Sequence, residues 1–225
     1  VLGRNLGSTT QNYRPVQAAA TVLRFDMGIA GGPVQTGFTA VGPRDIFNTT
    51  RGYGWSTRVA AADRPWAATN NGFSDLNRDF HTGSDATFYV QVGSGTFNLR
   101  VYLSNPYGTN GYRYTYDNFQ VQPEGGTAFP VTLLTPNVIT IANLTGSDAD
   151  GDGRLGIQFI DIGGGQNLNW VTSGLQIWDS GSADPGAISS LLASGVGSSP
   201  SSGVTINDAM LAPLQADGED AAAFE

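Results

Sequence analysis

The feature that most constrains this chain is a repeated alternation of apolar and polar residues over short segments, each followed by a glycine-rich turn. The segment Thr96–Ser104 shows it best, with Phe97, Leu99, Val101 and Leu103 on one face. A period of two is that of a β-strand with one face buried. The strand segments include no amphipathic stretch of about a dozen residues that would indicate a long helix. The pattern therefore predicts an all-β chain.

The same pattern predicts the other strands and their arrangement. We expect strands over 21–27, 86–92, 96–104, 119–122, 131–134, 138–144, 154–162 and 171–178, short strands between long loops over 38–66, and one helical turn within 73–80. The turn Gly93-Ser94-Gly95 predicts a hairpin between its flanking strands. Many short strands separated by turns are typical of an antiparallel two-sheet β-sandwich. We expect this domain over 21–179, after an arm at 1–20 and before a tail at 180–225 that is first Ser/Gly-rich and then acidic.

Composition excludes several classes of function. The net charge is −8, and the 11 basic residues, all Arg, are scattered, so the chain lacks the basic patch that DNA or RNA binding requires. It contains no apolar run of about 18 residues that could span a membrane. It has no Cys, which excludes disulfides, thiolate catalysis and Cys-ligated zinc. The low charge content and the abundance of Gly, Thr and Asn favour a bacterial protein that is extracellular or on the cell surface.

Several landmarks, in their order along the chain, resemble a known family. They are Leu23-Arg24-Phe25-Asp26-Met27-Gly28, Gly52-Tyr53-Gly54-Trp55, Asp63-Arg64, Asp117-Asn118-Phe119 and Asn169-Trp170-Val171. Together they resemble the galactose-binding-like jelly rolls related to malectin, above all the carbohydrate-binding-type modules attached to bacterial polysaccharide esterases and lyases. The resemblance covers about residues 22–179. It implies a two-sheet jelly roll whose loops bind glycans, and it covers neither the arm nor the tail.

The residues do not predict an enzyme. The only imidazole is that of His81, in a polar stretch, and the G-x-S-x-G elbow of a serine hydrolase is absent. A glycosidase needs two facing carboxyl groups. Glu occurs only at positions 124, 219 and 225, and no spacing in the sequence pairs two acids in this way. We therefore expect a non-catalytic module.

Aromatic residues in loops suggest sugar binding. Sugar rings present flat C–H faces that aromatic rings cover, while amide, carboxylate or guanidinium groups bind the hydroxyl edges. The sequence-based candidates for a glycan site are Tyr53, Trp55, Arg64, Tyr112, Tyr114, Asn118, Asn169 and Trp170. Trp66, Tyr107, Tyr116 and Asp117 are their neighbours in these loops. An alternative remains open, in which Trp55 and Trp170 instead fill the core and fix the loops to the sandwich.

One acidic turn suggests calcium. Asp148, Asp150 and Asp152 repeat the first half of an EF-hand loop, in which oxygen ligands two residues apart converge on a hard cation. Position twelve of such a loop is Phe159 here, so the bidentate Glu is missing. The alternative is a polar turn without a metal, where Asp and Gly are favoured for their backbone conformations. A structural Ca²⁺ at this turn is one expectation, and the plain turn is the other.

The arm and the tail suggest a second function. An extended peptide can add as a strand to the sheet edge of a neighbouring subunit, and head-to-tail contacts that do not close build a filament. Residues 1–20 and 200–214 are the candidate donors. The chain is thus predicted to bind a glycan, with the alternative of a structural subunit of an extracellular filament or surface layer that assembles through these segments.

Overall fold

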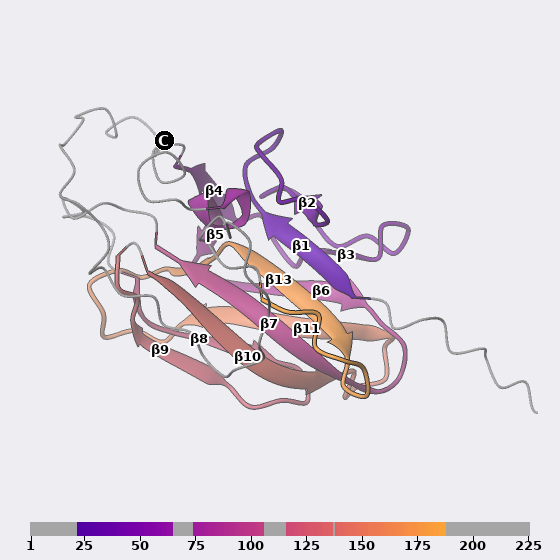
Figure 1. The fold of residues 1–225 in the computed structure, drawn as a ribbon. Coiled ribbons are helices and arrows are strands. Elements are labelled where there is room, and N and C mark those ends of the chain that lie inside the picture. Colours follow the sequence, from indigo (N-terminus) through magenta and orange to yellow (C-terminus); the bar gives the residue numbers. More distant parts are fainter. Residues whose placement is uncertain (1–21, 65–73, 106–115, 137, 188–225) are drawn as a thin grey trace, which may run out of the picture.

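The computed structural model describes residues 22–64, 74–105, 116–136 and 138–187 (Figure 1). Two five-stranded sheets make up most of this part. Sheet A has the order β10-β7-β13-β1-β2, formed by β1 (Leu23–Met27), β2 (Thr39–Val41), β7 (Thr96–Ser104), β10 (Ile139–Ser147) and β13 (Gly174–Asp179). Sheet B has the order β3-β6-β11-β8-β9, formed by β3 (Tyr53–Trp55), β6 (Asp85–Gln91), β8 (Asp117–Pro123), β9 (Phe129–Leu133) and β11 (Arg154–Asp161).

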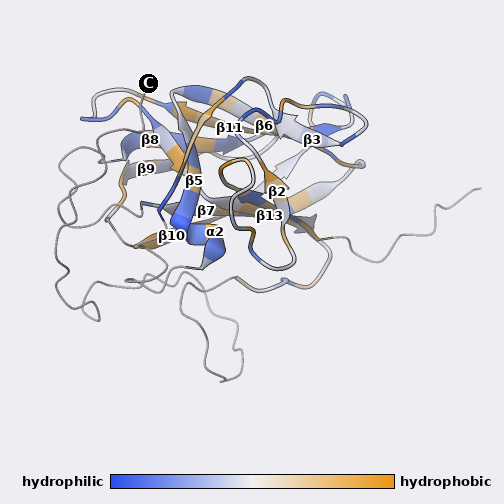
Figure 2. Ribbon diagram, turned by 90° about the horizontal axis from the view of Figure 1, so that it is seen from above, coloured by the Kyte–Doolittle hydropathy of each residue, from blue (hydrophilic) through white to orange (hydrophobic). Residues whose placement is uncertain are grey.

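A smaller sheet and a short helix complete the described fold. Sheet C has the order β12-β5-β4, from β4 (Ala60–Asp63), β5 (Asp79–Gly83) and β12 (Trp170–Thr172). The helix α2 (Asp75–Arg78) is the helical turn expected within 73–80, and it lies beside β7 and β10 (Figure 2). Leu76 of α2 packs there with Tyr102 and Ile139 in a cluster of its own. The two-sheet sandwich predicted from the alternation is confirmed.

The core lies between sheets A and B and is formed by the apolar faces of their strands. Phe25, Val101 and Leu175 enter it from sheet A, and Phe88 and Ile157 enter it from sheet B, all of them buried. The alternation that predicted the strands thus also predicted which face of each strand is buried. The polar positions of β7 and β13 lie on the opposite face of sheet A.

The expected hairpin at Gly93–Gly95 is wrong. The strand before this turn, β6, pairs with β3 and β11 in sheet B, whereas the strand after it, β7, pairs with β10 and β13 in sheet A. The turn therefore crosses from one sheet to the other. The acidic turn after β10 makes the same kind of crossing, because β10 belongs to sheet A and β11 to sheet B. A period of two specifies the buried face of a strand, but it leaves its partner undetermined.

Two further observations concern the pairing of β2 and the segment after β13. β2 pairs with β1 in parallel, through Phe25 and Thr39, unlike the antiparallel pairs expected. The chain after β13 stays with the sandwich as far as Asp184: the backbone N–H of Ser180 donates to the carbonyl of Thr96 at 2.9 Å, and Asp184 forms an ion pair with Arg100. The candidate donor segments 1–20 and 200–214 lie outside the described residues, so their role in assembly stays a prediction.

Candidate functional site

Polar side chains from two loops meet at one end of the sandwich. Asp117, at the start of β8, accepts hydrogen bonds from the backbone N–H groups of Gln166 at 3.0 Å and Asn167 at 3.2 Å. The amide of Asn169 in turn donates to the side-chain oxygen of Asn167 at 2.7 Å. Asp117 thus fixes the loop before β12, and the structure brings two predicted site residues, Asn118 and Asn169, to the same end. We call Asp117, Asn118, Asn167 and Asn169 the loop-end cluster.

A third predicted residue, Arg64, lies close to this end. Its guanidinium is stacked on the ring of Phe80, 5.8 Å from the ring centroid. Phe80 in turn meets Tyr116 edge-on, with ring centroids 6.1 Å apart, and Tyr116 precedes the loop-end cluster in the chain. Arg64 is only 6% exposed. It therefore supports this end from within the fold more than it offers its charge to solvent.

Trp55 and Trp170 correct the prediction that both stack on a sugar. Both are fully buried, and their rings stack on each other with centroids 5.3 Å apart and an interplanar angle of 22°. Phe159 packs against both rings. They fill the core, which was the alternative left open: Trp55 is the last residue of β3 and Trp170 the first residue of β12. No ligand can reach their faces without opening the core.

Of the remaining predicted aromatic residues, the structure describes Tyr53. It is half-buried at the edge of the core, where its ring lies 4.9 Å from that of Phe25 and carries the guanidinium of Arg51 at 5.2 Å. Tyr53 is joined to the core rather than to the loop-end cluster. Tyr112 and Tyr114, like Tyr107 and Trp66, lie outside the described residues, so their part in a glycan site stays a prediction.

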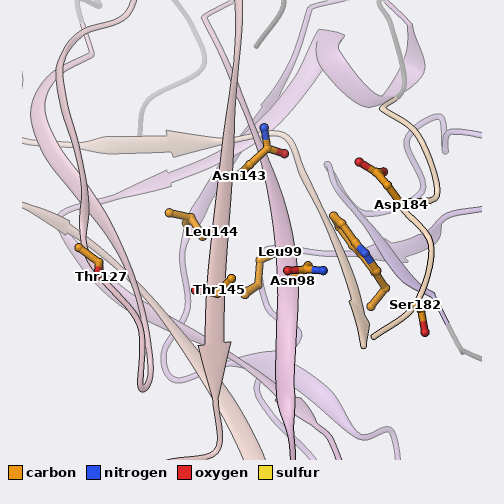
Figure 3. A pocket seen from close by; sticks show the side chains of 9 residues that line it. Asn98, Leu99, Thr127, Asn143, Leu144, Thr145, Ser182 and Asp184 are labelled. Carbon is orange, nitrogen blue, oxygen red and sulfur yellow. The ribbon is translucent and has the colours of Figure 1, made fainter. Parts of the chain in front are cut away.

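A groove that was not predicted runs along sheet A, where Asn98 of β7, Thr145 of β10 and Trp178 of β13 lie opposite one another (Figure 3). Its volume is about 470 Å³. Its lining residues are Asn98, Leu99, Thr127, Asn143, Leu144, Thr145, Trp178, Ser182 and Asp184. We call it the sheet-A groove. The signal for it was present in the sequence as polar residues at every outward position of residues 96–104.

The acidic turn between β10 and β11 brings together three carboxylates, of which Asp148 and Asp150 belong to the predicted set. Oxygen atoms of Glu124, Asp148 and Asp150 lie within 4.8 Å of one another. Asp152 instead forms an ion pair with Arg154. The carboxylate of Asp148 accepts the N–H groups of Gly151 at 2.7 Å and Gly153 at 2.8 Å, as in a plain polar turn. Sequence reasoning missed Glu124, because it comes from the end of β8. The structure supports the turn, and a calcium ion there stays a prediction.

Two buried carboxyl groups lie near the start of the loop between β1 and β2. Asp26 accepts the N–H of Gln35 at 2.6 Å through one oxygen. Within the described chain, its other oxygen and both oxygens of Asp79 have no hydrogen-bond partner. Burial raises the pKa of Asp26 to about 7 and that of Asp79 to about 9, and the mutual repulsion of the pair adds to the shift for Asp79. A Cβ at Gly28 would lie 2.1 Å from Asp79 Oδ2, so a larger residue there requires the Asp79 carboxyl group to move.

His81 is a structural histidine inside the same region. Its Nδ1 accepts the indole N–H of Trp55 at 3.0 Å, and its Nε2 lies 2.9 Å from the carbonyl of Gly28. This arrangement requires the neutral ring with the proton on Nε2, which donates to Gly28. Burial lowers the pKa of His81 to about 4. The imidazole therefore links sheet B to the β1–β2 loop.

Comparisons with known proteins bear on the fold. Neither a family model nor a curated protein matches the chain. Solved structures that are similar include protein YXIM from Bacillus subtilis (18% identity, TM-score 0.50, 71% of this chain and 40% of that one). They also include Bacteroides uniformis β-glucuronidase (9% identity, TM-score 0.48, 71% of this chain and 18% of that one). A third is the ANX2 ectodomain from Arabidopsis thaliana (16% identity, TM-score 0.47, 71% of this chain and 50% of that one). The chain thus spans half or less of each of these structures. At such identities the likeness, which for YXIM reaches a TM-score of 0.50, concerns the two-sheet fold alone.

Proposed function

We propose that this chain is a non-catalytic, extracellular carbohydrate-binding module that holds a glycan at the loop-end cluster. The observation that carries the proposal is the fixation of the loop before β12 by Asp117. It brings Asn118 and Asn169, from two separate loops, to one end of the sandwich. The segment 106–115, which carries Tyr107, Tyr112 and Tyr114, joins the described chain directly beside Tyr116.

The chemistry of this end suits hydroxyl groups. Amide side chains both donate and accept hydrogen bonds, so each can bind a vicinal pair of sugar hydroxyls. An aromatic ring adds burial of a C–H face, which contributes about 2–3 kcal/mol. With few contacts, affinity is on the order of millimolar. The resemblance of the chain to malectin-related modules supports the same ligand class. No helix among the described residues is long and apolar enough to cross a membrane.

The test is glycan binding by the full chain and by variants that remove one amide each. We expect weak, saturable binding to a neutral oligosaccharide in a glycan-array screen followed by calorimetry. Asn118→Gly is the first variant, because Asn118 has φ 49°, a left-handed conformation that glycine adopts without strain. Asn169→Ala is the second. Each variant should raise the Kd about tenfold, because it removes an amide that forms hydrogen bonds with the glycan.

The matched control is Gln91→Ala. The side chain of Gln91 is exposed. In the register of β6 and β11, Gln91 lies opposite Arg154, at the end of sheet B away from the loop-end cluster. Its removal should leave binding unchanged. Binding that survives both Asn variants would show that the loop-end cluster is not the site. A chain that binds no glycan at millimolar concentrations would contradict the proposed function itself.

A further inference from the structure

We infer that the sheet-A groove is a second binding site, for a neutral, hydroxyl-rich saccharide. The inference takes its ligand class from the proposed function, but it concerns a different surface. The groove lies over the paired residues Trp178, Asn98 and Thr145, whereas the loop-end cluster lies beyond the opposite ends of β7 and β13. The two sites can therefore be tested separately.

Arg100 organises the walls of the groove. It stands on the outer face of β7 and is only 6% exposed. Its guanidinium donates to the side-chain oxygen of Asn143 at 3.2 Å and to both carboxylate oxygens of Asp184 at 3.0 and 2.8 Å. It also stacks on Trp178, 5.2 Å from the ring centroid. One buried cation thus fixes three lining side chains in place before any ligand arrives, which reduces the entropy cost of binding.

The orientation of Asn143 follows from this network. Because its side-chain oxygen accepts from Arg100, its amide N–H₂ group is left to donate elsewhere. Asn143 and Asn98 stand on the neighbouring strands β10 and β7, and Ser182 and Asp184 stand on the segment after β13 (Figure 3). Two amides, a hydroxyl and a carboxylate therefore line the same groove from three parts of the chain.

Trp178 forms the wall of the groove beside Arg100. Its side chain lines the groove and is 5% exposed, yet within the described residues its indole N–H has no hydrogen-bond partner. The same holds for the amide nitrogen of its neighbour on β13, Gln176, whose oxygen accepts from Arg100 at 3.2 Å and from Tyr102 at 2.9 Å. A buried donor without an acceptor costs about 1–3 kcal/mol. A ligand oxygen can accept from the indole N–H only if the Trp178 ring turns, because this nitrogen has almost no accessible surface.

The charge balance of the groove selects for a neutral ligand. Asp184 is the acidic lining residue, and its charge is compensated by Arg100. Among the described residues of the groove, this pairing leaves no uncompensated cation for a phosphate, sulfate or uronate. The lining also has an apolar part, formed by Trp178 and by portions of Leu99 and Leu144. A volume of about 470 Å³ accommodates a short stretch of a sugar chain.

The experiment follows Trp178 in the full chain. The protein is labelled with 5-fluorotryptophan, and the ¹⁹F signal of Trp178 is assigned from the spectrum of Trp178→Phe. The probes are cellohexaose, xylohexaose and mannohexaose, with tetragalacturonate as an anionic comparison. We expect the Trp178 signal to shift in a saturable way with at least one neutral probe and not with tetragalacturonate. Asn143→Ala and Asn98→Ala should each weaken this response about tenfold, while Asn118→Gly and Gln91→Ala should leave it unchanged.

Each other outcome overturns the inference in a recognisable way. If no neutral probe at 10 mM shifts the Trp178 signal, the groove is not a saccharide site. If calorimetry shows sugar binding that Asn118→Gly abolishes and Asn143→Ala preserves, the inference is wrong and the proposed function stands. If tetragalacturonate binds in the groove as well as the neutral probes do, the argument from charge is wrong. Asn143 is exposed and Asn98 half-buried on a pre-formed sheet, so two independent variants guard against a folding defect in either one.

Discussion

Asp79 is buried, and neither of its carboxylate oxygens has a hydrogen-bond partner in the described part of the chain. Burial raises its pKa to about 9, so the folded protein keeps a proton that the unfolded chain loses above about pH 4. The stability that comes from this proton is present at low pH and is lost as the pH rises towards 9, at about 1.4 kcal/mol per pH unit. We therefore expect Asp79→Asn to gain stability relative to the wild type between pH 5 and pH 9, measured by urea unfolding.

Several charged groups surround this site and belong to the comparison. Asp75 raises the pKa of Asp26. Asp26 and Asp63 raise the pKa of Asp79, whereas Arg78 lowers it. Asp85→Asn, at an exposed carboxylate outside this group, is the control and should follow the wild-type pH dependence. A constant difference between Asp79→Asn and the wild type from pH 5 to pH 9 would mean that Asp79 is ionised in the folded protein.

His81 gives a pH dependence of the opposite sign. Burial lowers the pKa of His81 to about 4. Between about pH 6.5 and pH 4, the imidazole is therefore protonated in the unfolded chain and neutral in the folded protein. This contribution to stability is therefore lost as the pH falls from 6.5 towards 4. His81→Phe should be less stable at pH 7, because it leaves the Trp55 N–H and the Gly28 carbonyl unpaired. Its deficit relative to the wild type should shrink by up to about 3 kcal/mol towards pH 4, and an unchanged deficit in urea titrations would count against a neutral His81.

Individual side chains show what could and could not be predicted from the sequence. A Trp that borders a predicted loop has the same sequence signature whether it faces a ligand or the core, and Trp55 and Trp170 proved to be core residues. Asn118 and Asn169 were predicted from the family resemblance, and the structure brings them to one end. Glu124 was missed, because its distance from the acidic turn is short only after folding.

At the scale of elements, the close approach of a turn to a neighbouring strand limits which side chains the turn can carry. Gly126, in the turn between β8 and β9, lies so close to β10 that an added Cβ would be 2.0 Å from the carbonyl oxygen of Thr145. Gly126→Ala must displace the turn or the backbone of β10, and we expect a loss of about 2 kcal/mol in the free energy of unfolding, measured in urea. Gly93→Ala is the matched control, since nothing lies within 4 Å of its Cβ position. Equal stability of the two variants would show that the turn at Gly126 adjusts freely.

The acidic turn is an element whose metal binding can be tested directly. Glu124 accepts the N–H groups of Ala149 at 2.7 Å and Asp150 at 3.1 Å, which ties β8 to the crossing between the sheets. If calcium adds to this arrangement, about 5 mM Ca²⁺ should raise the melting temperature of the wild type and not that of Asp148→Asn. Mg²⁺ is the comparison ion. A melting temperature that does not respond to Ca²⁺ would leave the turn as a polar connection held by its own hydrogen bonds.

Strand positions were predictable from local alternation, whereas strand partners were not. β7 was predicted with its observed bounds, because each of its apolar side chains faces the core. The hairpin between β6 and β7 failed, because a turn such as Gly93–Gly95 can either fold a strand back in its own sheet or pass it to the opposite sheet. That choice depends on contacts with strands far away in the sequence, such as β11 and β13.

At the scale of the whole molecule, charge bears on which glycans can bind. The chain carries a net charge of −8, and Arg100 and Arg78, two of its 11 basic residues, are held in ion pairs with Asp184 and Asp63. Both candidate surfaces therefore offer hydrogen-bonding groups without a net positive field. Attraction between exposed charges is screened beyond about 10 Å at 0.1 M salt, whereas hydrogen bonds between neutral groups are not. The affinity for a neutral glycan should consequently depend little on ionic strength.

This expectation can be checked by calorimetry with one neutral oligosaccharide at about 50 and 500 mM NaCl, and we expect less than about a twofold change in Kd. Heparin is the polyanionic comparison and should not bind at either salt concentration, because the acidic surface repels it. A Kd that rises steeply with salt would instead indicate release of counterions from an anionic ligand. In that case Arg residues, rather than the amides of the loop-end cluster and the sheet-A groove, would carry recognition.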